Sequence, residues 1–300
     1  MAQFCQGSVL RNKSVPVDTT ESTRFEVVND HDPGEAFLMT NSFEGKGIVV
    51  TGAGHGIGAA IAIRMAAGGA RVVVNDLDGE AASAVARQIG GLPVPGDAAT
   101  QAGVDSLIAS ARGHLGAIDI YFANAGVDLG QGLDSSSQDW ARALEVNLMA
   151  HVRAAQRLIP TWLQDGGGRL VVTASAAGLL TMLGNAPYSV SKHGAVAFAE
   201  WLSATYGHRG ITVQVICPQG VKTQMLDHAG PLRDLLSRDT ALEPEQVAET
   251  VWQALRDDRF LILPHPEVKD YYEYRATNTQ GWLAGMGKLQ RRLDAAGGIS

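Results

Sequence analysis

Cysteine is scarce in this sequence, and its scarcity argues against a fold held together by disulfide bonds. Two cysteines occur in 300 residues, Cys5 and Cys217, and the second lies inside the apolar run ITVQVICP. Small secreted domains depend on disulfides, whereas cytosolic proteins keep their thiols reduced. We therefore expect a cytoplasmic protein without a disulfide framework.

Long apolar runs and an excess of basic charge are also missing. No apolar stretch reaches the roughly 18 residues that cross a bilayer, and the first 30 residues are polar, unlike a secretion signal. The 24 basic residues are outnumbered by 31 acidic ones, which gives a net charge of -7 and no basic patch for nucleic acid or an anionic membrane. The eight histidines form no cluster at metal-ligand spacing, so we expect no metal and a small-molecule partner.

Short runs typical of β-strands alternate with longer helical patterns from about residue 43 onward. The expected strands are 47–52, 70–76, 92–94, 117–126, 168–175, 211–218 and 260–264. The expected helices are 56–67, 79–90, 102–113, 138–164, one after Pro187, 221–238 and 244–257. Because strands joined by crossover helices form a parallel sheet covered on both faces, the sequence predicts an α/β fold with a doubly wound, Rossmann-type sheet.

The predicted sheet accounts for one domain, 42–264, with an extension at each end. Residues 1–41 show neither helical nor strand periodicity, so we expect a flexible extension that the fold does not need. An arm that grips a neighbouring subunit is the alternative for this segment.

The last segment, 265–300, has a helical pattern over residues 265–293, which we expect to form a lid over the substrate end of the cleft. A capping helix or a subunit contact is the alternative. Helical spacing places an apolar stripe along it. The stripe consists of Tyr271, Tyr274, Trp282, Leu283, Met286 and Leu289.

The turn TGAGHGIG, Thr51 to Gly58, stands between the first strand and the first helix. Glycines let the backbone turn tightly and approach a pyrophosphate, and the helix N-terminus presents free N–H groups to that anion. A plain tight turn is the alternative. The expected cofactor contacts here are Gly52, Gly54, His55, Gly56, Ile57 and Gly58.

Asp76 ends the second expected strand, where a carboxylate can accept hydrogen bonds from the hydroxyls of an adenosine ribose. A 2′-phosphate would meet a like charge there, and the following Leu77 and Asp78 supply no cation. The position therefore favours NAD over NADP as the cofactor. The alternative is that Asp76 caps the next helix.

Ser175, Tyr188 and Lys192 form the most informative group of polar residues. Tyr188 and Lys192 are four residues apart, so both side chains share one face of a helix. A free tyrosine has a pKa of about 10, and a neighbouring ammonium group favours the phenolate. Ser175, at the end of a strand, can donate a hydrogen bond to a substrate oxygen. Taken singly, each residue also has an ordinary structural explanation.

The stretch from about Phe43 to Pro264 resembles the short-chain dehydrogenase/reductase family. TGAGHGIG is similar to the family's cofactor turn, and the Ser175, Tyr188 and Lys192 spacing matches its catalytic residues. Further matches occur in the family's order. They are Asp97 with Ala98 as the adenine contact, Asn124, Ala125 and Gly126 as the sheet-supporting NAG, Asn147 as the catalytic asparagine, and Pro218, Gly220, Val221 and Thr223 around the nicotinamide. Gln219 departs from the pattern by separating the usual adjacent Pro and Gly, which puts the geometry of that turn in doubt.

The resemblance implies a role for each catalytic residue. Tyr188 would be the general acid/base, Lys192 would lower its pKa and hold the nicotinamide ribose, and Ser175 would orient the substrate oxygen. Asn147 would anchor a water in a proton relay. The resemblance also implies homo-oligomers, either dimers or tetramers, paired through apolar helices.

The expected function is that of an NAD-dependent oxidoreductase that interconverts a hydrophobic secondary alcohol and its ketone. Two alternatives share the fold. A reductase of 3-oxoacyl thioesters would usually prefer NADPH, which Asp76 disfavours. A nucleotide-sensing regulator would bind the cofactor without catalysis, which the four intact catalytic positions disfavour.

Overall fold

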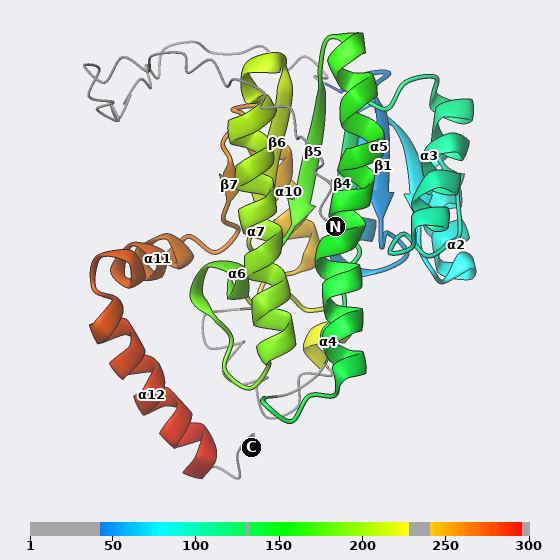
Figure 1. Cartoon of the computed structure of the whole chain (residues 1–300). Coiled ribbons are helices and arrows are strands. Elements are labelled where there is room, and N and C mark those ends of the chain that lie inside the picture. The colour runs from blue at the N-terminus through cyan, green and yellow to red at the C-terminus, as the bar shows by residue number, and fades with distance from the viewer. Residues whose placement is uncertain (1–42, 130–131, 228–240, 296–300) are drawn as a thin grey trace, which may run out of the picture. The chain divides into compact units, whose positions relative to one another are not determined.

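A computed structural model of the chain describes residues 43–129, 132–227 and 241–295 (Figure 1). The expected extension over residues 1–41 and most of the helix expected over 221–238 lie outside these ranges. Among the described helices, none combines the length and the apolar character needed to cross a bilayer.

The centre of the fold is a parallel sheet with the strand order β3-β2-β1-β4-β5-β6-β7. This confirms the doubly wound α/β prediction, since the order runs outward from β1 in both directions. The strands are β1 Gly47–Thr51, β2 Arg71–Asn75, β3 Leu92–Pro93, β4 Ile120–Ala123, β5 Gly168–Thr173, β6 Ile211–Ile216 and β7 Leu261–Ile262. Each expected strand is present, but most are shorter than their apolar runs.

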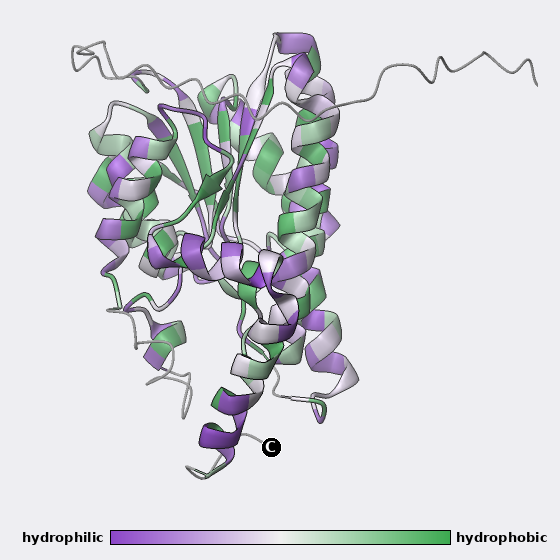
Figure 2. Ribbon diagram, turned by 90° about the vertical axis from the view of Figure 1, so that its left-hand side faces the viewer, coloured by the Kyte–Doolittle hydropathy of each residue, from purple (hydrophilic) through white to green (hydrophobic). Residues whose placement is uncertain are grey.

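Helices cover both faces of the sheet, and alternate strand residues supply the two cores. Val49 packs with α3 and α5 on one face, whereas Ile48 and Val50 pack with α1 and α10 on the other. Figure 2 shows the hydrophobic strands enclosed between these helices. The helices are α1 Gly56–Ala67, α2 Gly79–Ile89, α3 Gln101–Leu115, α4 Ser137–Leu144, α5 Ala150–Asp165, α6 Ala177–Leu180, α7 Ala186–Tyr206, α8 Gln224–Asp227, α10 Pro244–Ala254, α11 Glu267–Thr277 and α12 Thr279–Ala295.

The prediction of a single helix over 138–164 is wrong in one respect, because a π-helical turn interrupts the helix. Helix α4 passes into the π-helix Glu145–Met149 and then into α5. A π turn adds a residue to the helix, which changes the direction of the side chains beyond it, and such turns are frequent at functional sites. This one carries Asn147, whose side chain is fully buried.

The C-terminal segment forms two helices instead of the one expected over 265–293. Helix α11 ends at Asn278, which leaves the helical conformation with φ −142° and ψ 61°, and α12 follows directly. Val268 fixes α11 in the core with no exposed surface. Helix α12 has no buried residue among those described. The C-terminal segment is therefore anchored mainly through α11, and Trp282 of α12 packs against the same core while half-buried.

Candidate active site

A cavity of about 980 Å³ opens at the carboxyl edge of the sheet. Its wall contains Ser175, Tyr188 and Lys192. It also contains most of the expected cofactor contacts: Gly52, His55, Gly56, Ile57, Gly58, Asp76, Leu77, Asp97, Ala98, Asn124, Ala125, Gly126, Pro218, Gly220, Val221 and Thr223. Gly54 and Asn147 lie behind this wall. The structure thus brings together residues that follow six strands, β1 to β6.

The glycines of the turn after β1 let backbone segments approach one another more closely than a side chain would allow. A Cβ on Gly58 would lie 2.1 Å from the Gly52 carbonyl oxygen, and a Cβ on Gly52, where φ is +60°, would lie 2.8 Å from the Cα of Ala125. His55 is the N-cap residue of α1 and, within the described residues, its side chain makes no capping hydrogen bond. The first N–H groups of α1 therefore face the cavity, and this cradle suits a pyrophosphate.

Asp76 is held beside this turn by two backbone groups. Its Oδ2 accepts from the N–H of Gly54 at 2.8 Å, and its Oδ1 accepts from the N–H of Asp78 at 3.0 Å. The N-cap of α2 is Asp78, whose carboxylate accepts from Glu80 and Ala81. The alternative that Asp76 caps this helix is therefore wrong, and its carboxylate faces the cavity instead.

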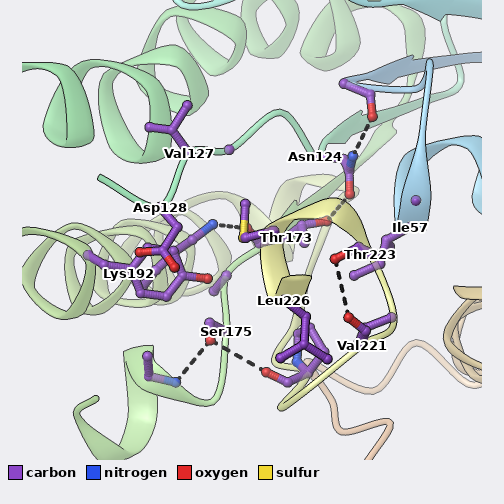
Figure 3. A pocket seen from close by; sticks show the side chains of 18 of the residues that line it. Ile57, Asn124, Val127, Asp128, Thr173, Ser175, Lys192, Val221, Thr223 and Leu226 are labelled. Carbon is purple, nitrogen blue, oxygen red and sulfur yellow. Dashed lines mark hydrogen bonds between the residues drawn. The ribbon is translucent and has the colours of Figure 1, made fainter. Parts of the chain in front are cut away.

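Asn124 ties the ends of three neighbouring strands together. Its Nδ2 donates to the carbonyls of Thr51 and Gly52 at 2.9 and 3.1 Å, and its Oδ1 accepts from the Thr173 hydroxyl at 3.0 Å (Figure 3). All of its side-chain polar atoms therefore serve the sheet. These hydrogen bonds support the sheet in the way that the NAG motif predicted.

Helix α7 presents the tyrosine and the lysine to the cavity. Its first turn begins at the N-cap Asn185, whose Oδ1 accepts from the N–H of Tyr188 at 3.0 Å. One turn further, Lys192 is 3% exposed, and its Nζ donates to the Thr173 carbonyl at 2.8 Å. The ammonium group is 5.6 Å from the centre of the Tyr188 ring. The expected i, i+4 pairing is thus present in the structure.

Burial dominates the protonation of both side chains. It raises the pKa of Tyr188 to about 12, although a hydrogen bond with Ser175 acts in the opposite direction. It lowers the pKa of Lys192 to about 8. In the protein alone, the shift of the Tyr188 pKa therefore has the opposite direction to the one expected from its lysine neighbour. The physical reason is that desolvation disfavours the phenolate, while the ammonium group is turned toward Thr173.

Asn147 braces the loop that follows β4. Its Oδ1 accepts from the N–H of Val127 and its Nδ2 donates to the Val127 carbonyl, both at 2.9 Å, and Nδ2 also donates to Ser191 at 3.0 Å. A Cβ on Gly126 would lie 3.3 Å from this Oδ1 and 3.4 Å from the Nζ of Lys192. The asparagine therefore fixes the backbone that passes directly over the lysine.

The departure at Gln219 does not disrupt the turn after β6. The Pro218 carbonyl accepts from the N–H of Ala176 at 2.8 Å, and the N–H of Gln219 donates to Nδ1 of the buried His265 at 3.1 Å. The extra residue therefore has its backbone partner in the segment that precedes α11. The pattern of this sequence gave no sign of that contact.

Some wall residues were not expected from the sequence, and others belong to the expected apolar stripe of the C-terminal segment. Asp128 stands near Lys192 in the same cavity (Figure 3). An apolar end of the wall comes from α12 and from loops around α6 and α8. It consists of Leu180, Met182, Leu183, Met225, Leu226, Trp282, Met286 and Leu289. Of the expected apolar stripe, Tyr271 and the three α12 residues line the cavity, whereas Tyr274 and Leu283 are 47% and 57% exposed.

Known proteins share both this sequence and this fold. A family model described as short chain dehydrogenase matches residues 46–233. A 1-deoxy-11-beta-hydroxypentalenate dehydrogenase from Streptomyces exfoliatus is 36% identical over 230 residues, which is 74% of this chain and 83% of that protein. A cyclohexanol dehydrogenase from an Acinetobacter species is 31% identical over 242 residues, 78% of this chain and 96% of that protein.

A solved structure has the same architecture. It is a short chain dehydrogenase/reductase from Burkholderia phymatum in complex with NAD, with a TM-score of 0.74 and 29% identity, covering 79% of this chain and 95% of that one. The family model spans more than half of the chain and the fold agrees with it. The chain belongs to the short-chain dehydrogenase/reductase family of oxidoreductases.

Proposed function

We propose that this protein is an NAD-dependent dehydrogenase that interconverts a hydrophobic secondary alcohol and its ketone. The observation that carries the proposal is that one cavity wall contains both the glycine-rich cradle with Asp76 and the side chains of Ser175, Tyr188 and Lys192. A dinucleotide bound in the cradle would extend toward these three side chains. When bound, NAD supplies the nicotinamide ring that accepts the hydride.

The choice of NAD over NADP depends on Asp76. Its carboxylate is fixed at the end of β2, where it can accept hydrogen bonds from both ribose hydroxyls. A 2′-phosphate at the same place would be repelled. Arg142, which lines the same cavity, is paired with Asp97 at 3.4 Å. The solved relative bound to NAD is consistent with this choice.

Tyr188 is the proposed general acid/base. In alcohol oxidation its oxygen takes the hydroxyl proton, and in ketone reduction the phenol returns a proton to the carbonyl oxygen. Ser175 would orient the substrate oxygen beside that phenol, and Lys192 would hold the nicotinamide ribose. Asn147 fixes the loop above Lys192 and anchors the water of a proton relay.

The apolar end of the cavity supports a hydrophobic substrate. Trp282, Met286 and Leu289 of α12 line the cavity, as do Leu180 and Leu183. Relatives named for cyclohexanol and for a hydroxypentalenate are consistent with a cyclic alcohol. A 3-oxoacyl thioester reductase remains the alternative, and its preference for NADPH would distinguish it.

We also propose that the protein is a homo-oligomer joined through α7. Two apolar side chains of this helix are exposed: Trp201 is 56% exposed and Val190 is 50% exposed. Exposed apolar surface on a helix that packs against the sheet is typical of a subunit contact. Analytical ultracentrifugation of the full chain measures the association, and a monomer at micromolar concentration would contradict it.

The test of the proposed function is NAD reduction with a panel of cyclic secondary alcohols, in wild type and in Tyr188→Phe. The variant deletes the ionisable group and little volume. We expect kcat to fall by about 100-fold or more, with NAD affinity unchanged in calorimetry. Near-normal turnover in Tyr188→Phe would refute the role of the tyrosine. A wild type that binds NAD but oxidises no alcohol would favour the nucleotide-sensing alternative.

A further inference from the structure

A second ionisable side chain, Asp128, lies at the catalytic end of the cavity, and the proposed mechanism does not use it. Asp128 follows the NAG segment after β4 and lines the cavity together with Val127, Tyr188 and Lys192. Figure 3 shows its carboxylate directed toward the space beside Lys192 and Ser175. A carboxylate here can contact whatever group the substrate carries beside its reacting carbon.

Asp128 is held rigidly from two sides. The residue before it, Val127, has both its N–H and its carbonyl bound by the side chain of Asn147. Its own Oδ1 accepts from Nδ2 of Asn185 at 2.5 Å. Since Oδ1 of Asn185 already accepts from the N–H of Tyr188, the Asn185 amide can only donate toward Asp128. One carboxylate oxygen is therefore committed to the protein.

The other oxygen, Oδ2, is available to a ligand. Within residues 43–129, 132–227 and 241–295, no group donates a hydrogen bond to it. Burial raises the pKa of Asp128, and the positive charge of Lys192 opposes that shift. Since Asp128 is half-buried and lines the cavity, Oδ2 is open to it, and a molecule that displaces water from this oxygen must supply a donor of its own or leave the oxygen unpaired.

The chemistry around Asp128 favours a neutral donor. An ammonium group on the substrate would be attracted to Asp128 but repelled by Lys192, whose charge acts on the same space. A hydroxyl group donates without this penalty. The apolar surface formed by Leu180, Leu183 and Trp282 is available to the carbon skeleton.

We propose that Asp128 is a specificity-determining residue, whose Oδ2 accepts a hydrogen bond from a second hydroxyl group next to the reacting carbon of the substrate. The substrate class is then a vicinal diol, or the corresponding hydroxyketone, on an apolar skeleton. This inference rests on the proposed dehydrogenase function. A site built to pair a substrate hydroxyl discriminates strongly against an analogue that lacks it, because its own polar group is left unpaired.

The test compares vicinal cyclohexanediol with two analogues that lack the second donor, its monomethyl ether and cyclohexanol, because the ether also adds a methyl group. Vicinal cyclohexanediol carries the second hydroxyl, and its monomethyl ether replaces that hydroxyl by an acceptor of similar position. We expect wild type to prefer the diol at least about tenfold in kcat/KM, which corresponds to about 1.4 kcal/mol. Asp128→Asn keeps an oxygen for Asn185 and turns an N–H toward the substrate, so this preference should fall by about tenfold or more.

The ratio of kcat/KM for the diol to kcat/KM for the ether separates recognition of the second hydroxyl from a general effect on catalysis. Removing the Asp128 charge also acts on Tyr188, because that charge contributes to the raised pKa of the phenol. This effect would shift the pH profiles of both substrates equally and leave their ratio unchanged. Asp134→Asn is the matched control, since Asp134 is an exposed carboxylate in the same loop, and it should preserve the preference for the diol.

Each result bears on the proposal. A wild type that oxidises cyclohexanol but gains nothing from the second hydroxyl overturns the role of Asp128 and leaves the dehydrogenase function intact. An Asp128→Asn variant that slows both substrates equally also overturns it, in favour of a purely positioning role. If wild type binds NAD and oxidises none of these alcohols, both the proposed dehydrogenase function and the role of Asp128 fail. A wild type without a preference for the diol refutes the proposal even if the variant is unstable.

Discussion

Replacing Asp76 by Asn should change which dinucleotide the protein prefers. The substitution keeps the shape of the side chain and removes its charge. One of the two backbone N–H groups that now bind the carboxylate, those of Gly54 and Asp78, would lose its acceptor. The amide oxygen can stay with the N–H of the buried Gly54, and water can replace the bond to the N–H of the exposed Asp78. The main consequence is therefore electrostatic.

The expected size of the effect follows from two interactions. A charge pair about 4 Å apart contributes about 1 kcal/mol in water and about 4 kcal/mol near a protein surface. Asp76 is partly exposed, so its repulsion of a 2′-phosphate falls between these limits. With NAD, a ribose hydroxyl that donates to the carboxylate contributes a further hydrogen bond of about 1.5 kcal/mol or more. Wild type should therefore prefer NAD at least about tenfold, equivalent to about 1.4 kcal/mol.

The assay is kcat/KM for NAD and for NADP with one alcohol at saturation. Asp76→Asn should lower the NAD efficiency, raise the NADP efficiency, and shift their ratio by about tenfold or more. Asp78→Asn is the control, because Asn is an equally good helix N-cap and the Asp78 carboxylate is turned toward the N–H groups of α2. Equal efficiencies with both dinucleotides in wild type, or a ratio that Asp78→Asn shifts as much as Asp76→Asn, would refute the reasoning.

Two further predictions concern protonation and the C-terminal helix. Because burial raises the pKa of Tyr188 to about 12, alcohol oxidation, which needs the phenolate, should accelerate as pH rises from about 7 to about 10; ketone reduction, which uses the phenol, should show no such rise. An oxidation rate that is flat or falls over this range contradicts the assignment. Ending the chain after Thr277 removes α12 but keeps the buried Val268, so thermal stability and NAD affinity should persist while the KM for the alcohol rises about tenfold. An unchanged KM shows that α12 does not enclose the substrate.

The sequence by itself determined the order of strands and helices and the parallel sheet that they form. It also determined which residues meet at the sheet edge, since the carboxyl ends of parallel strands converge there. Gly52, Asp76 and Ser175 could be placed this way because each ends a strand. Tyr188 and Lys192 could be paired because helical spacing is a local property.

Other features depend on contacts between segments distant in the chain. Local propensity predicted one helix over 138–164 and one over 265–293, but the chain breaks the first with a π turn and the second at Asn278. Asp76 and Asp78 are both of the residue type that caps helices. In the folded chain Asp78 caps α2, and the Asp76 carboxylate accepts from the N–H of Gly54 instead. These choices follow from packing against neighbours, which periodicity does not describe.

Tertiary structure alone decided the chemistry of the cavity wall. The pair of Asp128 and Asn185 is separated by 57 residues, and the contact of Gln219 with His265 by 46. Spacing reveals that Lys192 neighbours Tyr188, but not the burial that raises the pKa of the tyrosine. Desolvation and long-range pairing are properties of the folded chain, so they set the protonation states and the substrate contacts that the motifs leave open.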